Sequence, residues 1–291
     1  MTPDILCIGA MLWDIIGRSE RRMKAGHDVP GRIRHIPGGV ALNVAIAAAR
    51  WGMRPAILSA VGRDPQGDAL IAQSQELGVL TDFLARDTGL PTDSYMAVED
   101  VNGLIAAIAD AHSLEQAGDA ILAPLSDALR DWSGPVVLDG NLTESLLAQI
   151  AQDPRLARAD LRVIPASPGK AERLSPLIDA RRGCFYLNRI EAEILAGHPC
   201  PDAATAAQAV LARGAARVLV TDGPFTVADA VAGEPILTET PPSVTVARVT
   251  GAGDCFLAAH LAAERDNLPR DAALRQAVQA SAAHVSGKDV P

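Results

Sequence analysis

The sequence lacks the features that mark membrane, secreted and metal-stapled proteins. No apolar run reaches the roughly 18 residues that a membrane-spanning helix needs, although 48% of the 291 residues are hydrophobic. The start of the chain, MTPDILCIGA, has no basic region followed by a long apolar run, so we expect no signal peptide. The cysteines are few and scattered, at Cys7, Cys184, Cys200 and Cys255. Without metal-ligand or disulfide spacing, they favour a reducing, cytoplasmic location.

Positive charge is also scarce. The chain has 26 Lys and Arg against 35 Asp and Glu, which gives a net charge of −9. Nucleic-acid backbones are bound by clustered cations, so we expect no nucleic-acid polymer as the main partner. The one local cationic run, residues 18–24, is short and contains Glu20. We interpret this run as solvated surface.

Short apolar runs that end in glycine or turn residues alternate with helical patterns along most of the chain. DILCIGA, PAILSAVG, PVVLDGN and ARVLVTDG are typical of buried strands. ALNVAIAAARWG and QGDALIAQSQELGV are typical of helices that end at glycine. This alternation predicts an α/β fold, in which a mostly parallel sheet lies between two layers of helices.

Two segments interrupt the alternation and predict a second, smaller sheet. Residues 15–37 are polar with a few alternating apolar positions, and residues 92–110 read as two strands around DVNG, a hairpin signal. We expect these segments to form a small sheet that could act as a lid. The large domain would then comprise residues 1–14, 38–91 and 111–291.

The stretch VTGAGDCFLAAHLAA places Gly251, Ala252, Gly253 and Asp254 directly before a helical pattern. A helix N-terminus exposes unpaired N–H groups, and glycine lets an anion approach them closely. Asp254 has two interpretations that the spacing does not separate. It is either a helix cap, a common position for aspartate, or a general base beside an anion-binding backbone.

Two common nucleotide-binding motifs are absent. No G-x-x-x-x-G-K-[ST] motif occurs, because SPGK at 167–170 lacks both the upstream glycine and the following hydroxyl. No G-x-G-x-x-G follows the first strand pattern, so a dinucleotide fold is not favoured. Any nucleotide site must therefore be built from other residues.

Three motifs in order carry a resemblance to a known family. Gly38-Gly39 with Asn43 comes early, Asn188 with Glu191 lies in the middle as N-x-x-E, and TGAGD comes late. With this set, the chain resembles the ribokinase-like carbohydrate kinases of the phosphofructokinase B type over essentially its whole length. The resemblance implies a large α/β domain with a small β-sheet lid. It also implies ATP and magnesium for phosphoryl transfer to a small-molecule hydroxyl.

The resemblance also implies roles for single residues. Asp254 would be the base, and Gly251, Ala252 and Gly253 would form an anion hole. Asn188 and Glu191 would organise magnesium-bound water and the phosphates. The alternative for this pair is a helix-capping pair.

On the acceptor side, the resemblance implies contacts between sugar hydroxyls and four residues. These residues are Asp14, Gly38, Gly39 and Asn43. A side chain at Gly39 would block close approach of the substrate, and the alternative for Asn43 is helix capping.

Near the nucleotide, the resemblance is incomplete. Thr221, Gly223 and Thr250 are expected by the phosphates, but TDGPFTVAD has only one of the two spaced glycines that are usual there. Val249-Thr250 also replaces the common Asp-Thr pair. Potassium activation occurs in this family, and potassium is a further expected ion, but its carbonyl ligands leave no mark in a sequence.

Within the family, several short segments are similar to pseudouridine kinases. They include CIGAMLWDI, PGRIRHIPGGVALNVA, TDSYMAVEDVNGLIAAIAD and LDGNLT. This likeness implies phosphorylation of the 5′-hydroxyl of a nucleoside, pseudouridine. Residues that could contact its base or ribose are Ser94, Tyr95, Asp139, Asn141 and Lys170. Packing in the core of the lid is the alternative for Tyr95, and strand termination is the alternative for Asp139.

Other functions stay open at this point. A related kinase would act on ribose, another nucleoside or a sugar phosphate, and a silent relative would bind a nucleoside without turnover. A sugar-phosphate kinase needs a cationic pocket, and Lys24, Arg32, Arg34 and Lys170 form no clear cluster in the sequence. Because small sheets of this family often pair, the apolar face of 92–110 would suit a homodimer.

Overall fold

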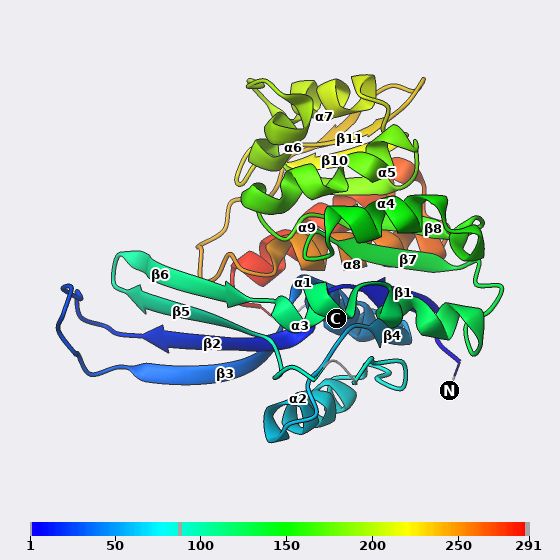
Figure 1. Cartoon of the computed structure of the whole chain (residues 1–291). Helices are drawn as coiled ribbons and strands as arrows, with labels where there is room; N and C mark the ends of the chain where they lie inside the picture. The colour runs from blue at the N-terminus through cyan, green and yellow to red at the C-terminus, as the bar shows by residue number, and fades with distance from the viewer. Residues whose placement is uncertain (1, 87–88, 289–291) are drawn as a thin grey trace.

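A computed structural model describes residues 2–86 and 89–288, and its centre is an eight-stranded sheet (Figure 1). The strand order is β12-β11-β10-β9-β8-β7-β1-β4. The parallel strands are β1 (Ile5–Ile8), β4 (Pro55–Leu58), β7 (Pro135–Asp139), β8 (Asp160–Ile164), β9 (Cys184–Asn188) and β10 (Arg217–Thr221). β11 (Val227–Val231) and β12 (Leu237–Glu239) complete one edge in antiparallel pairing. The expected α/β fold with a mostly parallel sheet is confirmed.

The central strands are continuous apolar runs because both of their faces are buried. Along β1, Leu6 and Ile8 belong to one core cluster, whereas Ile5 and Cys7 belong to another on the opposite face. Successive side chains of a strand point to opposite faces, so each run supplies both cores at once. The sheet is thus fixed between two helix layers.

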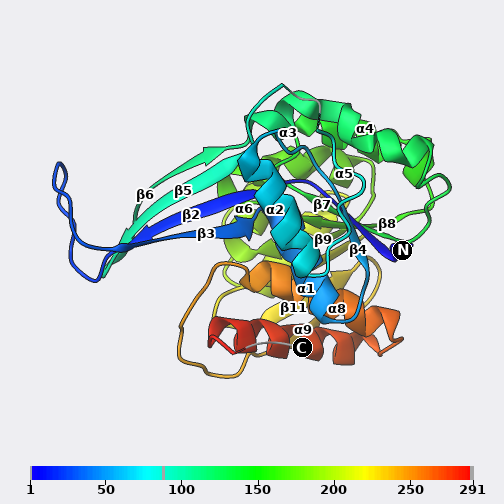
Figure 2. The ribbon, with the colours of Figure 1, turned by 90° about the horizontal axis from the view of Figure 1, so that it is seen from below.

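Helices cover both faces of this sheet, and Figure 2 shows α8 and α9 on one side and α4 and α5 on the other. One layer contains α1 (Val40–Arg50), α2 (Pro65–Glu76), α8 (Ala252–Arg265) and α9 (Arg270–Val285). The other contains α3 (His112–Ala117), α4 (Glu144–Gln152), α5 (Ser175–Asp179), α6 (Arg189–Ala196) and α7 (Ala203–Ala212). Short 3₁₀ turns are η1 (Gly118–Ser126), η2 (Pro154–Leu156) and η3 (Pro168–Leu174). In the described ranges, no helix combines the length and apolar character of a membrane span.

A separate four-stranded sheet, here called the small sheet, projects from the large domain as an arm (Figures 1 and 2). Its order is β3-β2-β5-β6, formed by β2 (Leu12–Arg18), β3 (Arg32–Gly38), β5 (Ser94–Asp100) and β6 (Gly103–Asp110). β2 begins and β3 ends beyond the expected segments 15–37 and 92–110. Asp14 and Gly38 therefore belong to strands of the small sheet.

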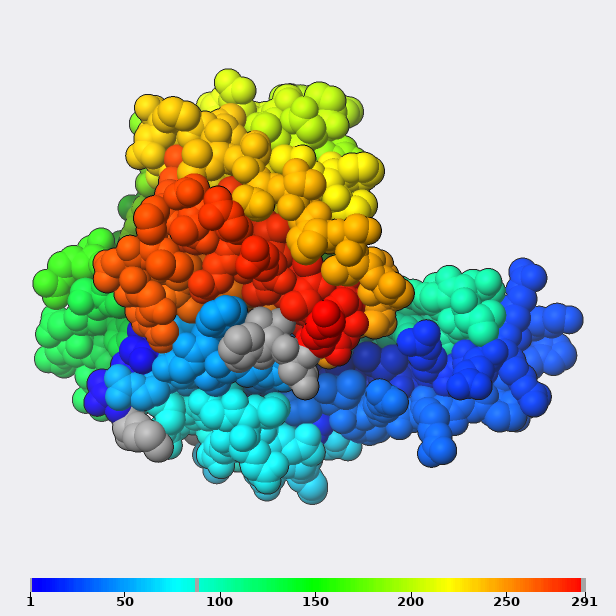
Figure 3. Space-filling view, turned by 180° about the vertical axis from the view of Figure 1, so that it is seen from behind, coloured from blue at the N-terminus to red at the C-terminus, as the bar shows by residue number. Residues whose placement is uncertain are grey.

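The two faces of the small sheet have different surroundings. Asp14, Ile16 and Arg18 lie on the face that borders a large cleft. Ile15 and Gly17 lie on the opposite face. Figure 3 shows the molecule from behind, with the orange and red C-terminal helices over the middle and the small sheet extending from one side.

Candidate active site

A cleft of about 1230 Å³ lies between the small sheet and the helices α1, α8 and α9. Five residues expected at the site line it, namely Asp14, Asn43, Thr250, Gly251 and Asp254. The carboxyl ends of parallel strands are where α/β proteins bind ligands. The structure thus gathers residues that are far apart in the chain.

Asp254 lies in the first turn of α8 but does not cap it. The N-cap residue is Gly251, with φ +83°, and no side chain makes a capping hydrogen bond there. The structure therefore excludes the capping interpretation of Asp254. Burial raises the pKa of the Asp254 carboxyl to about 7, interaction with the Asn43 side chain lowers it, and the nearby carboxylates of Asp139, Asp14 and Glu191 raise it.

Backbone N–H groups around Asp254 are free to bind an anion. No hydrogen bond joins the N–H of Gly251, Gly253 or Asp254 to another residue in the described part of the chain. The N–H of Ala252 instead donates to the Val249 carbonyl at 3.1 Å. Ala252 is thus engaged in this structure, in contrast to its neighbours in the expected anion hole.

Asp14 projects from β2 into the space that a side chain at Gly38 would need. A β-carbon built on Gly38 would lie 2.2 Å from Oδ2 of Asp14. Burial raises the pKa of Asp14 to about 6. Position 38 is therefore glycine because the Asp14 carboxylate occupies the space that a side chain there would need.

The second glycine has a different structural reason from the one expected. Gly39 has φ +94°, and a β-carbon there would lie 2.4 Å from the carbonyl oxygen of Ala10. The clash would be with the protein's own backbone, so blocked substrate approach is not needed to explain this glycine. Gly39 is also the N-cap of α1, which has no side-chain cap, so Asn43 is not a capping residue.

Asp139 binds backbone groups that shape the site. Its Oδ2 accepts from the N–H groups of Ala10 and Ala41 at 2.9 Å each, and its Oδ1 accepts from the N–H of Asn141 at 2.8 Å. Burial raises its pKa. Because these donors occupy the carboxylate, we assign Asp139 to holding the β1–β2 connection and the start of α1 rather than to direct substrate contact.

Lys170 and Asn141 form a chain of hydrogen bonds that ends at Asp139. Lys170 Nζ donates to Asn141 Oδ1 at 2.7 Å, and Asn141 Nδ2 donates to Asp139 Oδ2 at 3.2 Å. Burial lowers the pKa of Lys170, and the charge of Arg173 lowers it further. Neither Lys170 nor Asn141 is among the residues that line the cleft.

Ser94 and Tyr95 start β5, beside Asp14. Tyr95 is opposite Asp14 in the β2–β5 pair and packs against the core cluster on the α4 and α5 side of the large domain. Burial raises the pKa of its hydroxyl, and the charge of Asp14 adds to this. Ser94 is paired with Trp13 and Asp110. Tyr95 thus packs as a structural residue, but against the core cluster of the large domain and not in a separate core of the lid as expected.

Asn188 and Glu191 form a reciprocal helix cap at the start of α6. Asn188 Oδ1 accepts from the Glu191 N–H at 2.9 Å, and Glu191 Oε2 accepts from the Asn188 N–H at 2.8 Å. Burial raises the pKa of Glu191 to about 7. No group of three or more His, Cys, Asp or Glu side chains suited to a metal occurs in the described ranges.

The turn after β10 contains the remaining expected nucleotide residues. Thr221 Oγ1 donates to the Leu187 carbonyl at 3.4 Å. Gly223 has φ +57°, and no atom lies within 4 Å of a β-carbon built there. Asp222 between them pairs with Arg189 at 3.0 Å. The turn is therefore tied to β9 and α6 while Gly223 faces open space.

Several cleft residues were not expected from the sequence. Six arginines line the cleft, at Arg18, Arg21, Arg32, Arg34, Arg50 and Arg248, and of these the sequence offers only Arg32 and Arg34 as candidates for a cationic pocket. His284 of α9 also lines the cleft, and its Nε2 lies 2.8 Å from the Thr250 carbonyl. The alternation of Arg32 and Arg34 in a strand pattern is the one sequence signal that could have shown a shared face.

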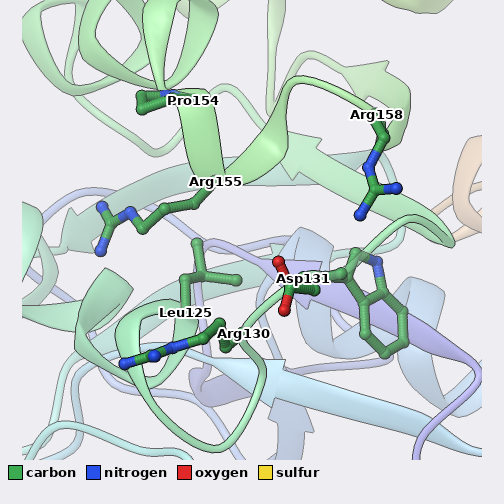
Figure 4. Close-up of a pocket in the computed structure, with 7 residues that line it drawn as sticks. Leu125, Arg130, Asp131, Pro154, Arg155 and Arg158 are labelled. Carbon is green, nitrogen blue, oxygen red and sulfur yellow. The ribbon is translucent and has the colours of Figure 1, made fainter.

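A second hollow of about 290 Å³ lies elsewhere on the large domain (Figure 4). Its lining includes Arg130, Asp131, Arg155 and Arg158 and none of the expected site residues. Arg155 is held by Asp153 at 2.6 Å and by Ser126 at 2.7 Å. Because Arg155 serves local structure and no expected site residue lines this hollow, it is not the candidate site.

Comparison with known proteins gives consistent matches. A family model described as pfkB family carbohydrate kinase matches residues 2–290. Pseudouridine kinase of Escherichia coli (strain K12) is 29% identical over 273 residues, which cover 91% of this chain and 85% of that protein. Ribokinase of Mus musculus is 28% identical over 264 residues, which cover 88% of this chain and 80% of that protein.

Among solved structures, that of Arabidopsis thaliana ribokinase complexed with ribose and ATP matches with a TM-score of 0.82. The match covers 100% of this chain and 95% of that chain at 23% sequence identity, so it supports the fold alone. The family model extends over nearly the whole chain, and the resemblance drawn from the three motifs is confirmed. The protein belongs to the pfkB family of carbohydrate kinases.

Proposed function

We propose that this kinase transfers the terminal phosphoryl group of ATP to the 5′-hydroxyl of a nucleoside, with pseudouridine as the preferred acceptor. One observation carries the proposal. The Asp254 carboxylate, which caps no helix, lies in the cleft beside unpaired N–H groups at the N-terminus of α8. A base and an anion hole in one cleft are what phosphoryl transfer to a hydroxyl requires.

Asp254 would act as the general base. Its carboxylate accepts the proton of the acceptor hydroxyl while the hydroxyl oxygen forms a bond to the terminal phosphorus of ATP. The bond from that phosphorus to the bridging oxygen of ADP breaks, and ADP leaves with the electron pair. The N–H groups of Gly251 and Gly253 stabilise the negative charge on the transferring group, because they are already oriented and unpaired.

Magnesium fits the donors near the start of α6. Glu191 uses only Oε2 in the helix cap, which leaves Oε1 for a magnesium-bound water, with Asn188 beside it. Magnesium is held by few carboxylates together with substrate phosphates, so a larger cluster of acidic residues is not needed. When bound, the ion neutralises phosphate charge.

Other residues would lie near the phosphates of ATP, namely Thr221, Gly223 and Thr250. Potassium is proposed as a further activating ion.

The acceptor would bind between the small sheet and α1. Asp14 and Asn43 line the cleft and would bind its hydroxyls, with the Gly38-Gly39 turn between them. Ser94 and Tyr95 lie beside Asp14 on the small sheet, and we propose Lys170 and Asn141, which are hydrogen-bonded to each other, as further contacts of the base or ribose. Likeness to the Escherichia coli pseudouridine kinase supports the nucleoside assignment, and a ribokinase at 28% identity makes ribose the closest alternative.

The test is ADP release with magnesium-ATP and potassium. Pseudouridine, uridine, ribose and fructose 6-phosphate are compared at equal concentration. Fastest turnover with pseudouridine supports the assignment, and faster turnover with another acceptor overturns the substrate while keeping the kinase. If nothing turns over but a nucleoside still binds tightly, the protein is a silent nucleoside-binding relative, and the proposed activity is wrong.

We also propose that two copies pair through the small sheet. Met96 and Ile108 are opposite each other on the face away from the cleft, and Ile33 lies on the same face. Their side chains are 48%, 68% and 73% exposed. Burial of this apolar face against a second copy would remove it from water.

A further inference from the structure

We propose that His284 of α9 is a positioning residue for the anion hole, because it holds the peptide unit that carries the Gly251 N–H. The inference rests on the proposed kinase function and adds to it a residue from a helix that holds none of the expected site residues. His284 acts through the backbone of Thr250 and Gly251 and does not touch the transferring phosphoryl group.

The His284 ring makes a hydrogen bond to the backbone just before α8. Its Nε2 lies 2.8 Å from the carbonyl oxygen of Thr250. A carbonyl oxygen only accepts, so Nε2 carries a hydrogen and donates it. Burial lowers the pKa of His284, and the bond to the Thr250 carbonyl raises it. The charges of Arg248 and Arg50 lower the pKa further, so at neutral pH the ring is neutral with its hydrogen on Nε2.

The Thr250 carbonyl and the Gly251 N–H belong to one peptide unit. A trans peptide unit is planar, with its C=O and N–H pointing in opposite directions, and none of the described peptide bonds is cis. A donor that fixes the carbonyl therefore also fixes the direction of the N–H. Because the carbonyl is turned toward His284, the Gly251 N–H points away from His284, and no described residue accepts from it.

His284 is the one hydrogen-bond donor to the Thr250 carbonyl among the described residues. In a continuous helix this oxygen would accept from the N–H of Asp254, four residues later, but α8 begins only at Ala252. Gly251 has φ +83°, and glycine has wide conformational freedom. Without His284, the peptide unit before Gly251 would be free to rotate.

The second free N–H of the anion hole has more support. The Gly253 N–H shares a peptide unit with the Ala252 carbonyl, which accepts from Ser281 Oγ of α9 at 3.1 Å. Ala252 and Gly253 also belong to the first turn of α8. Ser281 and His284 are three residues apart, so they lie on the same face of α9. That face orients both N–H groups, but the Gly251 unit lies outside the helix and depends on one side chain.

The end of α9, which packs along α8 (Figure 2), is joined to the same loop by further bonds. The N–H groups of Ala247 and Arg248 donate to the Val285 carbonyl at 2.9 and 3.2 Å. Arg248 Nε donates to the His284 carbonyl at 3.0 Å. A β-carbon built on Gly251 would lie 3.2 Å from His284 Nε2, so the ring lies against the glycine. These restraints hold the ring firmly, as a positioning residue requires.

Orientation of the N–H group affects the transition state more than the ground state. Donors that are already aimed at developing charge need no reorganisation during the reaction. Loss of the restraint should therefore lower kcat while ATP and the acceptor bind as before. A residue that only joined α9 to α8 would affect stability and leave kcat unchanged.

The experiment measures steady-state kinetics of His284 variants at saturating magnesium and potassium, with the acceptor that the wild-type protein phosphorylates fastest. His284→Leu has no donor, so kcat should fall by about tenfold to a hundredfold while both KM values change by less than about twofold. His284→Gln places an amide N–H at about the reach of Nε2 and should keep kcat within about threefold of the wild type. His284→Asn is shorter by one bond, so its kcat should be as low as that of His284→Leu.

Gln276→Leu is the matched control. Gln276 Nε2 of α9 donates to the Ala259 carbonyl of α8 at 3.1 Å, and neither residue lines the cleft. This variant loses the same kind of bond between the same two helices. Chemical denaturation should show similar losses of stability in Gln276→Leu and His284→Leu, but kcat should fall only in His284→Leu.

Three results would overturn the positioning role. One is a wild-type kcat in His284→Leu, and another is an equal loss of kcat in Gln276→Leu. The third is a raised KM with unchanged kcat in His284→Leu, since the ring would then contact a substrate directly. Failure of His284→Gln to restore kcat, when His284→Leu has lost it, would also contradict a role carried by the N–H donor.

Binding of an analogue separates this inference from the proposed activity. Aluminium fluoride with magnesium-ADP mimics the transferring phosphoryl group, and calorimetry measures its binding without turnover. Aluminium fluoride should tighten ADP binding to the wild type and to His284→Gln, and His284→Leu should lose about tenfold of this gain. If no acceptor gives ADP but the gain still depends on His284, the kinase proposal fails and the positioning role stands. If the wild type turns over and His284→Leu matches it in kcat and in the gain, the kinase stands and the positioning role fails.

Discussion

A β-carbon at Gly38 would lie 2.2 Å from Oδ2 of Asp14, so the two positions are coupled. Glycine at the end of β3 leaves room for a carboxylate that projects from β2. Hydrogen-bonding groups in an active site must be placed within a fraction of an ångström. A change at Gly38 should therefore act through the position of Asp14.

We expect Gly38→Ala to raise the KM of the acceptor by about tenfold or more, because the methyl group would displace the Asp14 carboxylate. The KM of ATP should change little. Gly17→Ala is the control, because atoms near its β-carbon lie at 3.8 Å, an ordinary contact, on the opposite face of the small sheet. Steady-state kinetics give both constants. Equal effects of the two variants would mean that Asp14 does not contact the acceptor.

Asp254→Asn should reduce kcat by about a hundredfold to ten-thousandfold, because the amide cannot accept the proton of the hydroxyl. ATP affinity, measured by calorimetry, should remain. Asp266→Asn, at the other end of α8, is the control and should keep full activity. Turnover of Asp254→Asn close to that of the wild type would rule out Asp254 as the base.

Activity should depend on pH through Asp254. Its pKa is raised from 3.8 to about 7 by burial, and the base works only when ionised. We expect kcat/KM to fall below pH 7, to roughly a tenth at pH 6. Asn43→Ala should move this limb to higher pH, because interaction with the Asn43 side chain lowers the pKa. If kcat/KM of the variant falls over the same pH range as that of the wild type, the Asn43 side chain does not affect the pKa of Asp254.

The same shift predicts how stability changes with pH. Between about pH 4 and 7, folded Asp254 holds a proton that the unfolded chain has released, so rising pH lowers the free energy of unfolding. Asp254→Asn has no such proton to lose. Chemical denaturation should therefore show that the variant gains stability relative to the wild type as pH rises from 5 to 8. If the difference in the free energy of unfolding between the variant and the wild type stays constant from pH 5 to 8, the pKa of Asp254 is not raised.

The sequence predicts the layered fold because its strands and helices carry clear local patterns. The apolar runs around Leu6 and Val136 identify a sheet with two buried faces. Asp139 shows the limit of this reasoning. Its partners Ala10 and Ala41 are 129 and 98 residues away. A local pattern cannot indicate which donors a strand end meets after folding, so its engagement with the backbone was not foreseeable.

The positions of the cleft arginines are only partly predictable from the sequence. The spacing of Arg32 and Arg34 places both on one face of a strand, but Arg18 joins them only through the β2–β3 register. Because residues 19–31 connect the strands without a short hairpin signal, that register is not readable from the sequence. The interpretation of residues 18–24 as solvated surface therefore missed that Arg18 and Arg21 face the cleft.

Glu191→Gln can separate magnesium binding from helix capping. Glutamine can still accept from the Asn188 N–H, so the cap should survive and stability should change little. We expect the magnesium concentration for half-maximal rate to rise by about tenfold or more, because the charge is lost. Asn188→Ala is the comparison and should lower stability by about 1 kcal/mol through the lost cap. An unaltered magnesium requirement in Glu191→Gln would leave Glu191 with a capping role alone.

Ile108→Lys tests whether the small sheets of two copies pair. The lysine would place a charge in the middle of the apolar face, beside Met96, and desolvating that charge in a dimer is unfavourable. Sedimentation equilibrium should show a dimer for the wild type and a monomer for the variant. Leu268→Lys is the control, because Leu268 is an exposed apolar residue of the large domain and should leave the dimer intact. A monomeric wild type, or a variant that still dimerises, would show that two copies do not pair through this face.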